Sequence, residues 1–411
     1  MAVVKFFAPD TDAYVDSVKR HIDEFAQRTG HTAHLNIIGS DPYFSNRISA
    51  FLQGEDAADV YMSGPVLMWE HYAAGFVEPL DDYLKSAKDD YDPDDFLGAL
   101  LRANRWTGRF GDKLGSGPLL EVPVNCESYN LAYVPEILSR FAEEVPATWD
   151  QFFAAAKRFT GKSGGSVRGF GQRGVFVWHT VYTGYATQFW SYGATDFDSS
   201  GRCVIASPAG VRATQDFIAA LKSAGPVDWP NQRWYELAID FAHGKYGLIV
   251  DSDHYVALFE NPALSRLVGK IGYALPPAGP TGARSPNLWT WSVVMNARSR
   301  NKKAAWDFIA WATSREFLLR SAFEGNMNPT RASVWNDPAF MKYTEPWGDF
   351  YKVSRKLVEE LADVRVTPAA NYLQIASRWT QALLDAYAGR DTVPEALEKA
   401  AQDINGMVRR S

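Results

Sequence analysis

The sequence is poor in cysteine and has no long apolar run, and both absences narrow the range of functions. Only two of its 411 residues are cysteines, Cys126 and Cys203. Neither lies in a CxxC motif or close to a histidine, which argues against a zinc knuckle or a redox centre. Their spacing leaves open whether they form a disulfide. No run of 18 or more apolar residues occurs, so no segment is expected to span a membrane.

A signal peptide and a concentration of basic residues are also missing. A strand-like stretch starts at residue 3 without a basic region, an apolar region and a cleavage site before it. The protein is therefore expected to be either cytosolic or exported with its signal absent from this sequence. Lys and Arg number 42 against 48 Asp and Glu, a net charge of −6, and no basic cluster stands out. Binding to a phosphate backbone needs such a cluster, so nucleic acid is not an expected partner.

What is present is a globular composition in which helical and strand patterns alternate. Apolar residues make up 46% and charged residues 22% of the chain, and 411 residues are enough for two or three domains. Periodicity predicts strands at 3–8, 34–38 and 59–62, with helices at 14–28 and 44–52. Later it predicts helices at 149–159, 207–221, 306–319 and 394–408, and a strand at 247–250. This order favours an α/β fold with helix-covered parallel sheets, which bind ligands beyond the carboxyl ends of their strands.

Several short motifs, in order along almost the whole chain, carry a family resemblance. They are EFAQRTG at 24–30, AADVY at 57–61, YAAGFVEPL at 72–80, VPVNCE at 122–127, KKAAWDFI at 302–309, NPTR at 328–331 and VPEAL at 393–397. In sequence and spacing the chain resembles the extracytoplasmic solute-binding proteins of ABC importers, in the carbohydrate-binding group that includes maltose-binding proteins (family 1). It departs from the maltose pattern at Val66 and Leu67, where that pattern has an acidic and a basic residue, so maltose itself is not expected.

The resemblance implies a two-lobe periplasmic-binding-protein fold of type II. Each lobe would be a mainly parallel sheet covered by helices, with the ligand cleft between the lobes and a hinge that closes on the ligand. The implied N-terminal lobe is 1–122 plus 290–325, and the C-terminal lobe is 123–289 plus 326–411. The implied hinge crossings lie near 121–124, 288–291 and 323–328.

Sugar sites combine planar aromatic side chains with polar groups that reach hydroxyls, and the resemblance implies a set of ligand residues of both kinds. In the first lobe these are the loop residues Asp10, Thr11, Ser40, Asp41, Ser63 and Gly64. For Asp10, Ser40 and Asp41 the alternative is helix capping, because each precedes a predicted helix.

The remaining implied ligand residues fall on the later strands and loops. They are Asn125, Glu127, Trp178, His179, Asp251, Trp289, Trp291 and Arg331. Each has an alternative reading: tryptophans also fill cores, Asp251 could lie in a surface turn, and Arg331 could form an ion pair within the protein.

Two glycine-rich motifs are not taken as functional. GFGQRG at 169–174 fits a dinucleotide-binding pattern, but no strand precedes it and no convincing helix follows. GKSGG at 161–165 matches a nucleophile-elbow pattern, but it follows a helical stretch instead of a buried strand. His31 and His34 lack further ligands at metal-binding spacing. No cofactor and no metal are therefore expected.

The expected function is the substrate-binding subunit of an ABC importer, which captures a sugar or oligosaccharide, possibly derivatised or acidic, and delivers it to the permease without chemistry. The resemblance implies a periplasmic location, a monomer, and membrane permease subunits as partners. Two alternatives stay open. One is a glycoside-active enzyme using Glu127 and Asp251 as a carboxylate pair. The other is a binding protein for a solute such as a polyol or peptide.

Overall fold

The computed structural model describes residues 1–10, 13–39, 43, 52–54, 56–87, 91–175 and 178–408. Contacts divide the chain into two units, each assembled from segments far apart in the sequence. Unit 1 consists of Met1–Cys126, Trp289–Tyr343 and Pro368–Ala370, and unit 2 of Glu127–Leu288, Thr344–Thr367 and Asn371–Ser411. Residues 326–343 fall in unit 1, whereas the sequence places them in the C-terminal lobe. The lobe limits and hinges stay a prediction, because contacts within a unit do not locate a hinge.

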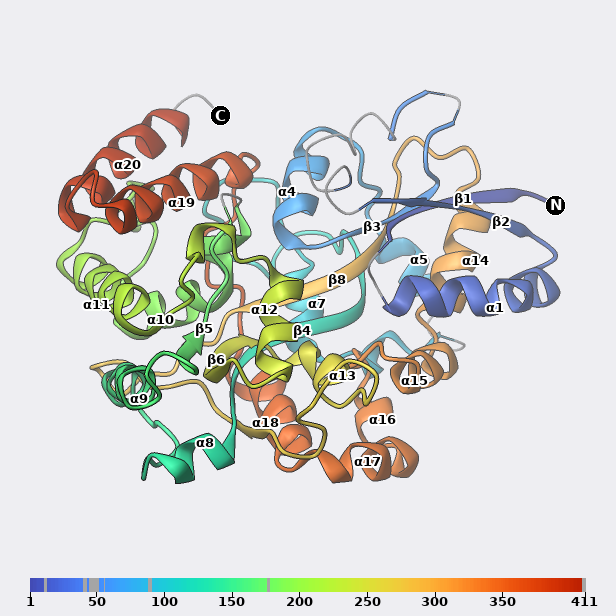
Figure 1. The fold of residues 1–411 in the computed structure, drawn as a ribbon. Coiled ribbons are helices and arrows are strands. Elements are labelled where there is room, and N and C mark those ends of the chain that lie inside the picture. The colour runs from blue at the N-terminus through green and yellow to red at the C-terminus, as the bar shows by residue number, and fades with distance from the viewer. Residues whose placement is uncertain are drawn as a thin grey trace. The chain divides into compact units, whose positions relative to one another are not determined.

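The sheet of unit 1 contains the first strands of the chain (Figure 1). Strand β1 (Val3–Pro9) pairs in parallel with β2 (Thr32–Ile38) and β3 (Val60–Ser63), and β8 (Leu288–Met295) pairs antiparallel with β3. Helix α1 (Ala13–Thr29) packs against β2, and α14 (Lys302–Ala312) packs against β1. Helix α1 buries Tyr14, Val15, Val18 and Phe25 at helical spacing and is followed by Gly30, whose φ is +71°.

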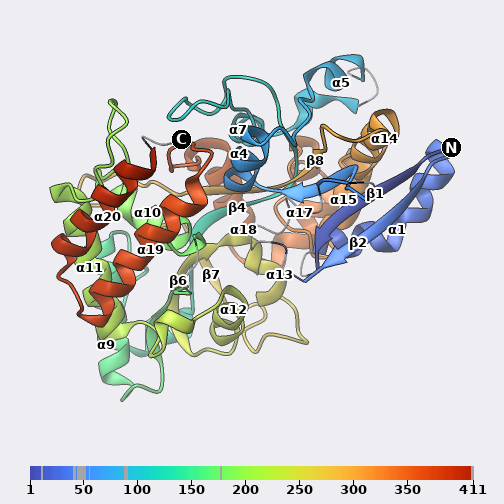
Figure 2. The same ribbon diagram turned by 90° about the horizontal axis from the view of Figure 1, so that it is seen from above.

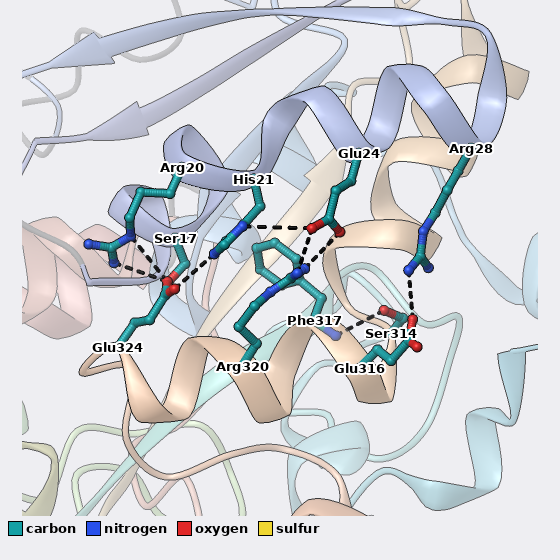
Figure 3. A network of polar contacts seen from close by, with 10 residues as sticks. All are labelled: Ser17, Arg20, His21, Glu24, Arg28, Ser314, Glu316, Phe317, Arg320 and Glu324. Carbon is teal, nitrogen blue, oxygen red and sulfur yellow. Dashed lines mark hydrogen bonds and ion pairs between the residues drawn. The ribbon is translucent and has the colours of Figure 1, made fainter.

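Short helices complete unit 1. They are α4 (Pro65–Ala73), α5 (Asp81–Ser86), η2 (Pro93–Asp95), α7 (Gly98–Ala103), α15 (Arg315–Phe323), α16 (Ala332–Trp335) and α17 (Pro338–Thr344). Helices α1 and α15 are joined by a row of charged side chains (Figure 3). Glu24 accepts two hydrogen bonds from Arg320, at 2.5 and 2.9 Å, and Glu324 accepts one from Ser17 at 2.6 Å.

In unit 2, most of the described strand pairings are antiparallel. Strand β4 (Val122–Tyr133), which begins in unit 1, pairs antiparallel with β6 (Tyr246–Ser252) and β7 (Gly272–Ala274). Strand β5 (Arg168–Gly171) pairs in parallel with β6. The parallel pairing expected from the sequence therefore holds for β1 with β2 and β3, and for β5 with β6, while the long strands β4 and β8 run antiparallel to their neighbours.

Helices flank the sheet of unit 2. The long ones are α9 (Trp149–Lys162), α11 (Pro208–Ala224), α19 (Tyr372–Ala388) and α20 (Val393–Val408). The short ones are α8 (Pro135–Arg140), η3 (Val181–Tyr185), α10 (Ala186–Ser191), η4 (Trp229–Asn231), α12 (Trp234–Ala242), η5 (Asp253–Tyr255), α13 (Val256–Phe259), η6 (Glu345–Trp347), α18 (Phe350–Lys356) and η7 (Leu357–Leu361). Helix α9 packs on β5, and α11, α19 and α20 pack on one another farther out (Figure 2).

Most helices and strands lie where the sequence predicts them. The strands at 3–8, 34–38, 59–62 and 247–250 and the helices at 14–28, 149–159, 207–221 and 394–408 are confirmed to within a few residues. The prediction of a single helix at 306–319 is wrong, because the helical conformation is interrupted between α14 and α15. There Ser314 accepts a hydrogen bond from the backbone N–H of Phe317 and starts a new helix. Of the helix predicted at 44–52, only Leu52 lies within the described residues.

Tryptophan side chains fill much of the core of each unit. Trp69, Trp106 and Trp335 are fully buried in unit 1, and Trp229 and Trp379 in unit 2. Both cysteines are buried, and no disulfide joins Cys126 to Cys203. Over the described part of the chain, no helix has the length and apolarity needed to cross a membrane.

Candidate functional site

Four of the predicted ligand residues come together in unit 2 around Arg173, a residue that the sequence analysis did not select. The Arg173 guanidinium donates two hydrogen bonds to the Asp251 carboxylate, from Nε to Oδ2 at 3.0 Å and from Nη2 to Oδ1 at 2.5 Å. The same Nη2 lies 4.0 Å from Oε2 of Glu127. This two-pronged geometry is the strongest form of arginine–carboxylate contact and fixes both side chains.

Strands β4 and β6 hold the two carboxylates close together. Asn130 on β4 pairs with Asp251 on β6, and Glu127 lies three residues earlier on β4, 4.0 Å from the arginine that binds Asp251. The next residue on β4, Ser128, donates its N–H to Asp253 at 2.9 Å and its hydroxyl at 2.6 Å, and this brace fixes the backbone beside Glu127. Burial raises the pKa of Asp253 to about 6.

The charges in this cluster differ in their access to solvent. The Asp251 side chain is 1% exposed, that of Arg173 is 10% exposed and that of Glu127 is 15% exposed. Burial raises the pKa of the Asp251 carboxyl, and the positive charge of Arg173 opposes that rise. Asp251 is therefore an internal counter-ion in a buried strand end, and not a surface turn residue.

Aromatic side chains and a histidine surround the charged cluster. The Tyr255 ring lies 5.3 Å from the Arg173 guanidinium carbon, and Trp234 stacks on Tyr255 at 6.4 Å with an interplanar angle of 17°. The half-buried Trp178 and His179 rings meet edge to face at 5.5 Å. Burial, together with Arg173 and Arg233, lowers the pKa of His179 to about 3, so its imidazole is neutral at physiological pH. The arrangement offers charged acceptors, a neutral imidazole and flat apolar faces, which suits a polyhydroxylated ligand.

The glycine-rich stretch that holds Arg173 is explained by close packing. A Cβ on Gly169 would lie 2.1 Å from the carbonyl oxygen of Ala156, and one on Gly174 would lie 1.9 Å from that of Trp229. The backbone oxygen of Arg173 accepts a hydrogen bond from the Trp229 indole at 2.7 Å. The GxGxxG spacing at 169–174 thus lets this loop lie against its neighbours and present Arg173.

In unit 1 the structure brings together Ser63, Gly64, Trp289 and Trp291. Ser63 ends β3 and pairs with Ser292 on β8, so Gly64 lies against the Trp289 ring. A Cβ on Gly64 would lie 2.3 Å from that ring. Trp289 is 4% exposed, Trp291 is half-buried, and the two rings meet edge to face at 5.3 Å. Of this pair, Trp291 offers more surface to a ligand.

The remaining predicted residues of unit 1 lie elsewhere. Asp10 is exposed directly after β1, and Thr11, Ser40 and Asp41 lie outside the described residues. Asn125 is fully buried and donates a hydrogen bond to the Asn326 side chain at 2.8 Å. The two described positions of this group, Asp10 and Asn125, therefore add no cluster comparable to that around Arg173.

Arg331 makes its polar contacts inside unit 1, as in the alternative reading given for it. Its guanidinium donates to the backbone oxygens of Thr313, Asp92 and Tyr91 at 2.9, 2.8 and 3.1 Å. It also lies 3.4 Å from the Asp95 carboxylate and is 1% exposed. A side chain engaged in this way has little left to offer a ligand, and we leave Arg331 out of the ligand set proposed below.

The described ranges contain no group of three or more His, Cys, Asp or Glu side chains placed to hold a metal ion. The chemistry available around Arg173 is therefore hydrogen bonding, charge and ring stacking.

Comparison with known proteins shows the family and the fold. The family model described as "Bacterial extracellular solute-binding protein" matches residues 8–317. The erythritol/L-threitol-binding protein of Mycolicibacterium smegmatis is 29% identical over 390 residues, which cover 92% of this chain and 80% of that protein.

Two solved structures of ABC solute-binding proteins share the fold over almost the entire chain. One, from Agrobacterium radiobacter K84 in complex with ribitol, has a TM-score of 0.86 and 21% identity and covers 99% of this chain and 98% of the other. The other, a maltose-bound protein of T. maritima, has a TM-score of 0.83 and 21% identity and covers 99% and 100%. The expected α/β periplasmic-binding-protein fold is confirmed, and the chain belongs to the bacterial extracellular solute-binding proteins, a family of binding proteins and not of enzymes.

Proposed function

We propose that this chain is the substrate-binding subunit of an ABC importer whose ligand is a short polyol or a small sugar. The observation that carries the proposal is the cluster of Arg173, Asp251, Glu127 and His179 beside the half-buried Trp178. Carboxylates accept hydrogen bonds from hydroxyls, and a neutral imidazole can donate or accept one. The sequence analysis expects a sugar or oligosaccharide and leaves a polyol open as an alternative, and the relative named for binding erythritol and L-threitol supports the short polyol.

The proposed delivery step follows the family. The protein would act in the periplasm, close its two lobes on the ligand through a hinge, and present the closed form to the permease. Glu127, Trp178 and His179 are the proposed ligand residues of unit 2, with Asp251 as the counter-ion that fixes Arg173, and Trp291 with Ser63 are those of unit 1.

A calorimetric titration tests the proposal. Erythritol, L-threitol, ribitol and mannitol are compared with maltose and with a peptide mixture, and the recovered ligand is analysed for chemical change. We expect tight binding of at least one polyol or monosaccharide and its recovery intact. At a ligand concentration of 100 Kd the protein should gain about 2.7 kcal/mol of stability, which a thermal shift detects. Binding of peptides alone, or conversion of the ligand, would contradict the proposal.

A second candidate, a disaccharide or longer sugar, is favoured by the Trp289–Trp291 pair in unit 1, because paired rings can stack on successive sugar units. The same titration decides between them: maltose or a longer sugar would then bind more tightly than any polyol.

A further inference from the structure

The charge of the Arg173 guanidinium is already compensated within unit 2. Asp251 takes two of its N–H groups, and Glu127 lies 4.0 Å from Nη2. The Tyr255 ring lies near the same guanidinium. One cation thus faces two carboxylates in a place that is largely closed to solvent. An arginine that receives an anionic ligand offers a pair of N–H groups to it. In Arg173 the pair on Nε and Nη2 is occupied by Asp251, and Glu127 adds a second negative charge 4.0 Å from Nη2.

The other ionisable groups near the cluster do not reverse this balance. His179 is neutral, because burial and the two arginines lower its pKa to about 3. Burial also raises the pKa of Tyr129 and of Tyr255, so both phenols stay uncharged. Arg233 contributes to the lowered pKa of His179, but it is exposed, so solvent weakens its effect relative to the buried charges.

The imidazole of His179 has an atom to offer a ligand. Its Nδ1 is buried and has no hydrogen-bond partner among the described residues. A buried polar atom of this kind is satisfied by a water or by a ligand group. A hydroxyl can serve both this nitrogen and the neighbouring carboxylates, because it donates and accepts, whereas an ionised carboxylate or phosphate only accepts.

We infer that Arg173 is a positioning residue masked by Asp251 and Glu127, and that this masking makes the ligand site selective for uncharged polyhydroxylated compounds over their acids. The inference rests on the proposed function and deepens it. Arg173 is fixed by Asp251 and holds Glu127, the more exposed carboxylate, as an acceptor for hydroxyls, and Glu127 repels anions. The acidic sugars left open by the sequence are therefore excluded as ligands.

The test compares two pairs of ligands that differ by one terminal group: ribitol with ribonate, and erythritol with erythronate. Affinities are measured by calorimetry at pH 7 for the wild-type protein and for Asp251→Asn, Glu127→Gln and Arg233→Ala. The wild-type protein should bind a polyol at least 100-fold more tightly than its acid. Asp251→Asn removes the carboxylate that compensates the charge of Arg173. It should lower the ratio of polyol affinity to acid affinity at least 10-fold, and the acid should bind more tightly than it does to the wild-type protein.

Three variants separate this effect from a general loss of structure. Glu127→Gln leaves the buried Arg173–Asp251 pair in place and should shift the ratio in the same direction. Asp240→Asn removes another aspartate of unit 2, one paired with Lys245 at 2.6 Å, and should leave the ratio unchanged. In Asp251→Asn/Arg233→Ala, the gained affinity for acids should persist, because Arg173 and not Arg233 supplies it. Circular dichroism melts show whether each variant is folded.

The outcomes distinguish the inference from the proposed function. If the wild-type protein binds acids as tightly as polyols, the inference is wrong and the proposed function stands. An unchanged ratio in both Asp251→Asn and Glu127→Gln, with both variants folded, would also overturn the masking role. If no neutral compound binds at all, the proposed function fails, and the inference fails with it.

Discussion

At the scale of single residues, the contact between Gly64 and Trp289 makes a sharp prediction. Gly64→Ala would place a Cβ 2.3 Å from the Trp289 ring and 2.8 Å from the backbone oxygen of Thr290, so the ring or the strand has to shift. We expect a loss of about 1–3 kcal/mol in the free energy of unfolding, measured by urea denaturation. Gly161→Ala is the matched control, because Gly161 lies within α9 with no atom in the way. It should gain up to about 1 kcal/mol.

A buried histidine of unit 1 makes stability depend on pH. His71 is 4% exposed, and burial lowers its pKa from 6.5 to about 4. The unfolded chain therefore binds a proton between these two values and the folded chain does not, so stability falls as the pH falls below about 6.5. Between pH 7 and pH 5 this group alone should cost about 2 kcal/mol.

The measurement for His71 is the difference between two proteins. Urea denaturation of the wild-type protein and of His71→Gln is compared at pH 7 and pH 5, since other titrating groups contribute equally to both. The drop in stability should be about 2 kcal/mol smaller in His71→Gln. Equal drops in the two proteins would mean that His71 is protonated in the folded state.

The sequence selects the two carboxylates beside Arg173, but not Arg173 itself. Glu127 and Asp251 were selected because they match family positions, and the structure places both beside Arg173. Arg173 lies in a glycine-rich stretch, residues 169–174, whose pattern suggests a nucleotide-binding motif, and nothing in that pattern marks the arginine. Arg331 was selected, yet it makes its contacts inside unit 1. Sequence shows that an arginine is present, but its partners come from residues far apart in the chain.

At the scale of helices and strands, the charged row between α1 and α15 should stabilise unit 1 modestly (Figure 3). The hydrogen bonds from Arg320 lower the pKa of Glu24, so the contribution of the pair is present above a pH of about 4.5 and is lost as the pH falls further. Both side chains are about one third exposed, and solvent screening limits their coupling to about 0.5–1 kcal/mol.

A double-mutant cycle measures this coupling. Glu24→Gln, Arg320→Gln and the double variant are unfolded in urea at pH 7 in low and in high salt. The coupling should shrink in high salt and decrease as the pH falls below about 4.5. The pair Asp16–Lys19, which lies within α1 and is more exposed, serves as the control and should show no measurable coupling. A coupling of equal size for both pairs would mean that the contact between α1 and α15 adds nothing.

The helices and strands that the sequence predicted well are those whose signal is local. Helix α1 shows apolar residues at helical spacing and ends at a glycine with positive φ, so its limits can be read from the sequence. The break between α14 and α15 was missed because apolar residues continue across it. It is fixed by Ser314 and by tertiary contacts of Thr313, whose backbone oxygen accepts from Arg331 and whose hydroxyl meets that of Tyr91.

At the scale of the whole molecule, the alternation of helices and strands was enough to predict an α/β class, and the ordered motifs were enough to predict the family. The strand directions were not accessible in the same way. Strands β4 and β8 are antiparallel to partners up to about two hundred residues away, such as Val60 with Met295, and no local pattern encodes such a pairing. The identity of the ligand depends likewise on side chains brought together from distant segments.

Two of the residues that the sequence selects should therefore affect different properties. Arg331 should affect the stability of the protein, and Trp178 its affinity for the ligand. Arg331→Met removes the donor to the backbone oxygens of Thr313, Asp92 and Tyr91, and we expect a loss of about 3 kcal/mol or more in unfolding free energy. Its Kd for the bound polyol should change less than threefold. Trp178→Ala removes a half-buried ring beside His179 and should weaken binding about tenfold or more with a much smaller effect on stability. Denaturation and calorimetry on the same preparations measure both quantities. The opposite pattern, weak binding in Arg331→Met and unchanged binding in Trp178→Ala, would move the ligand site away from the Arg173 cluster and toward unit 1.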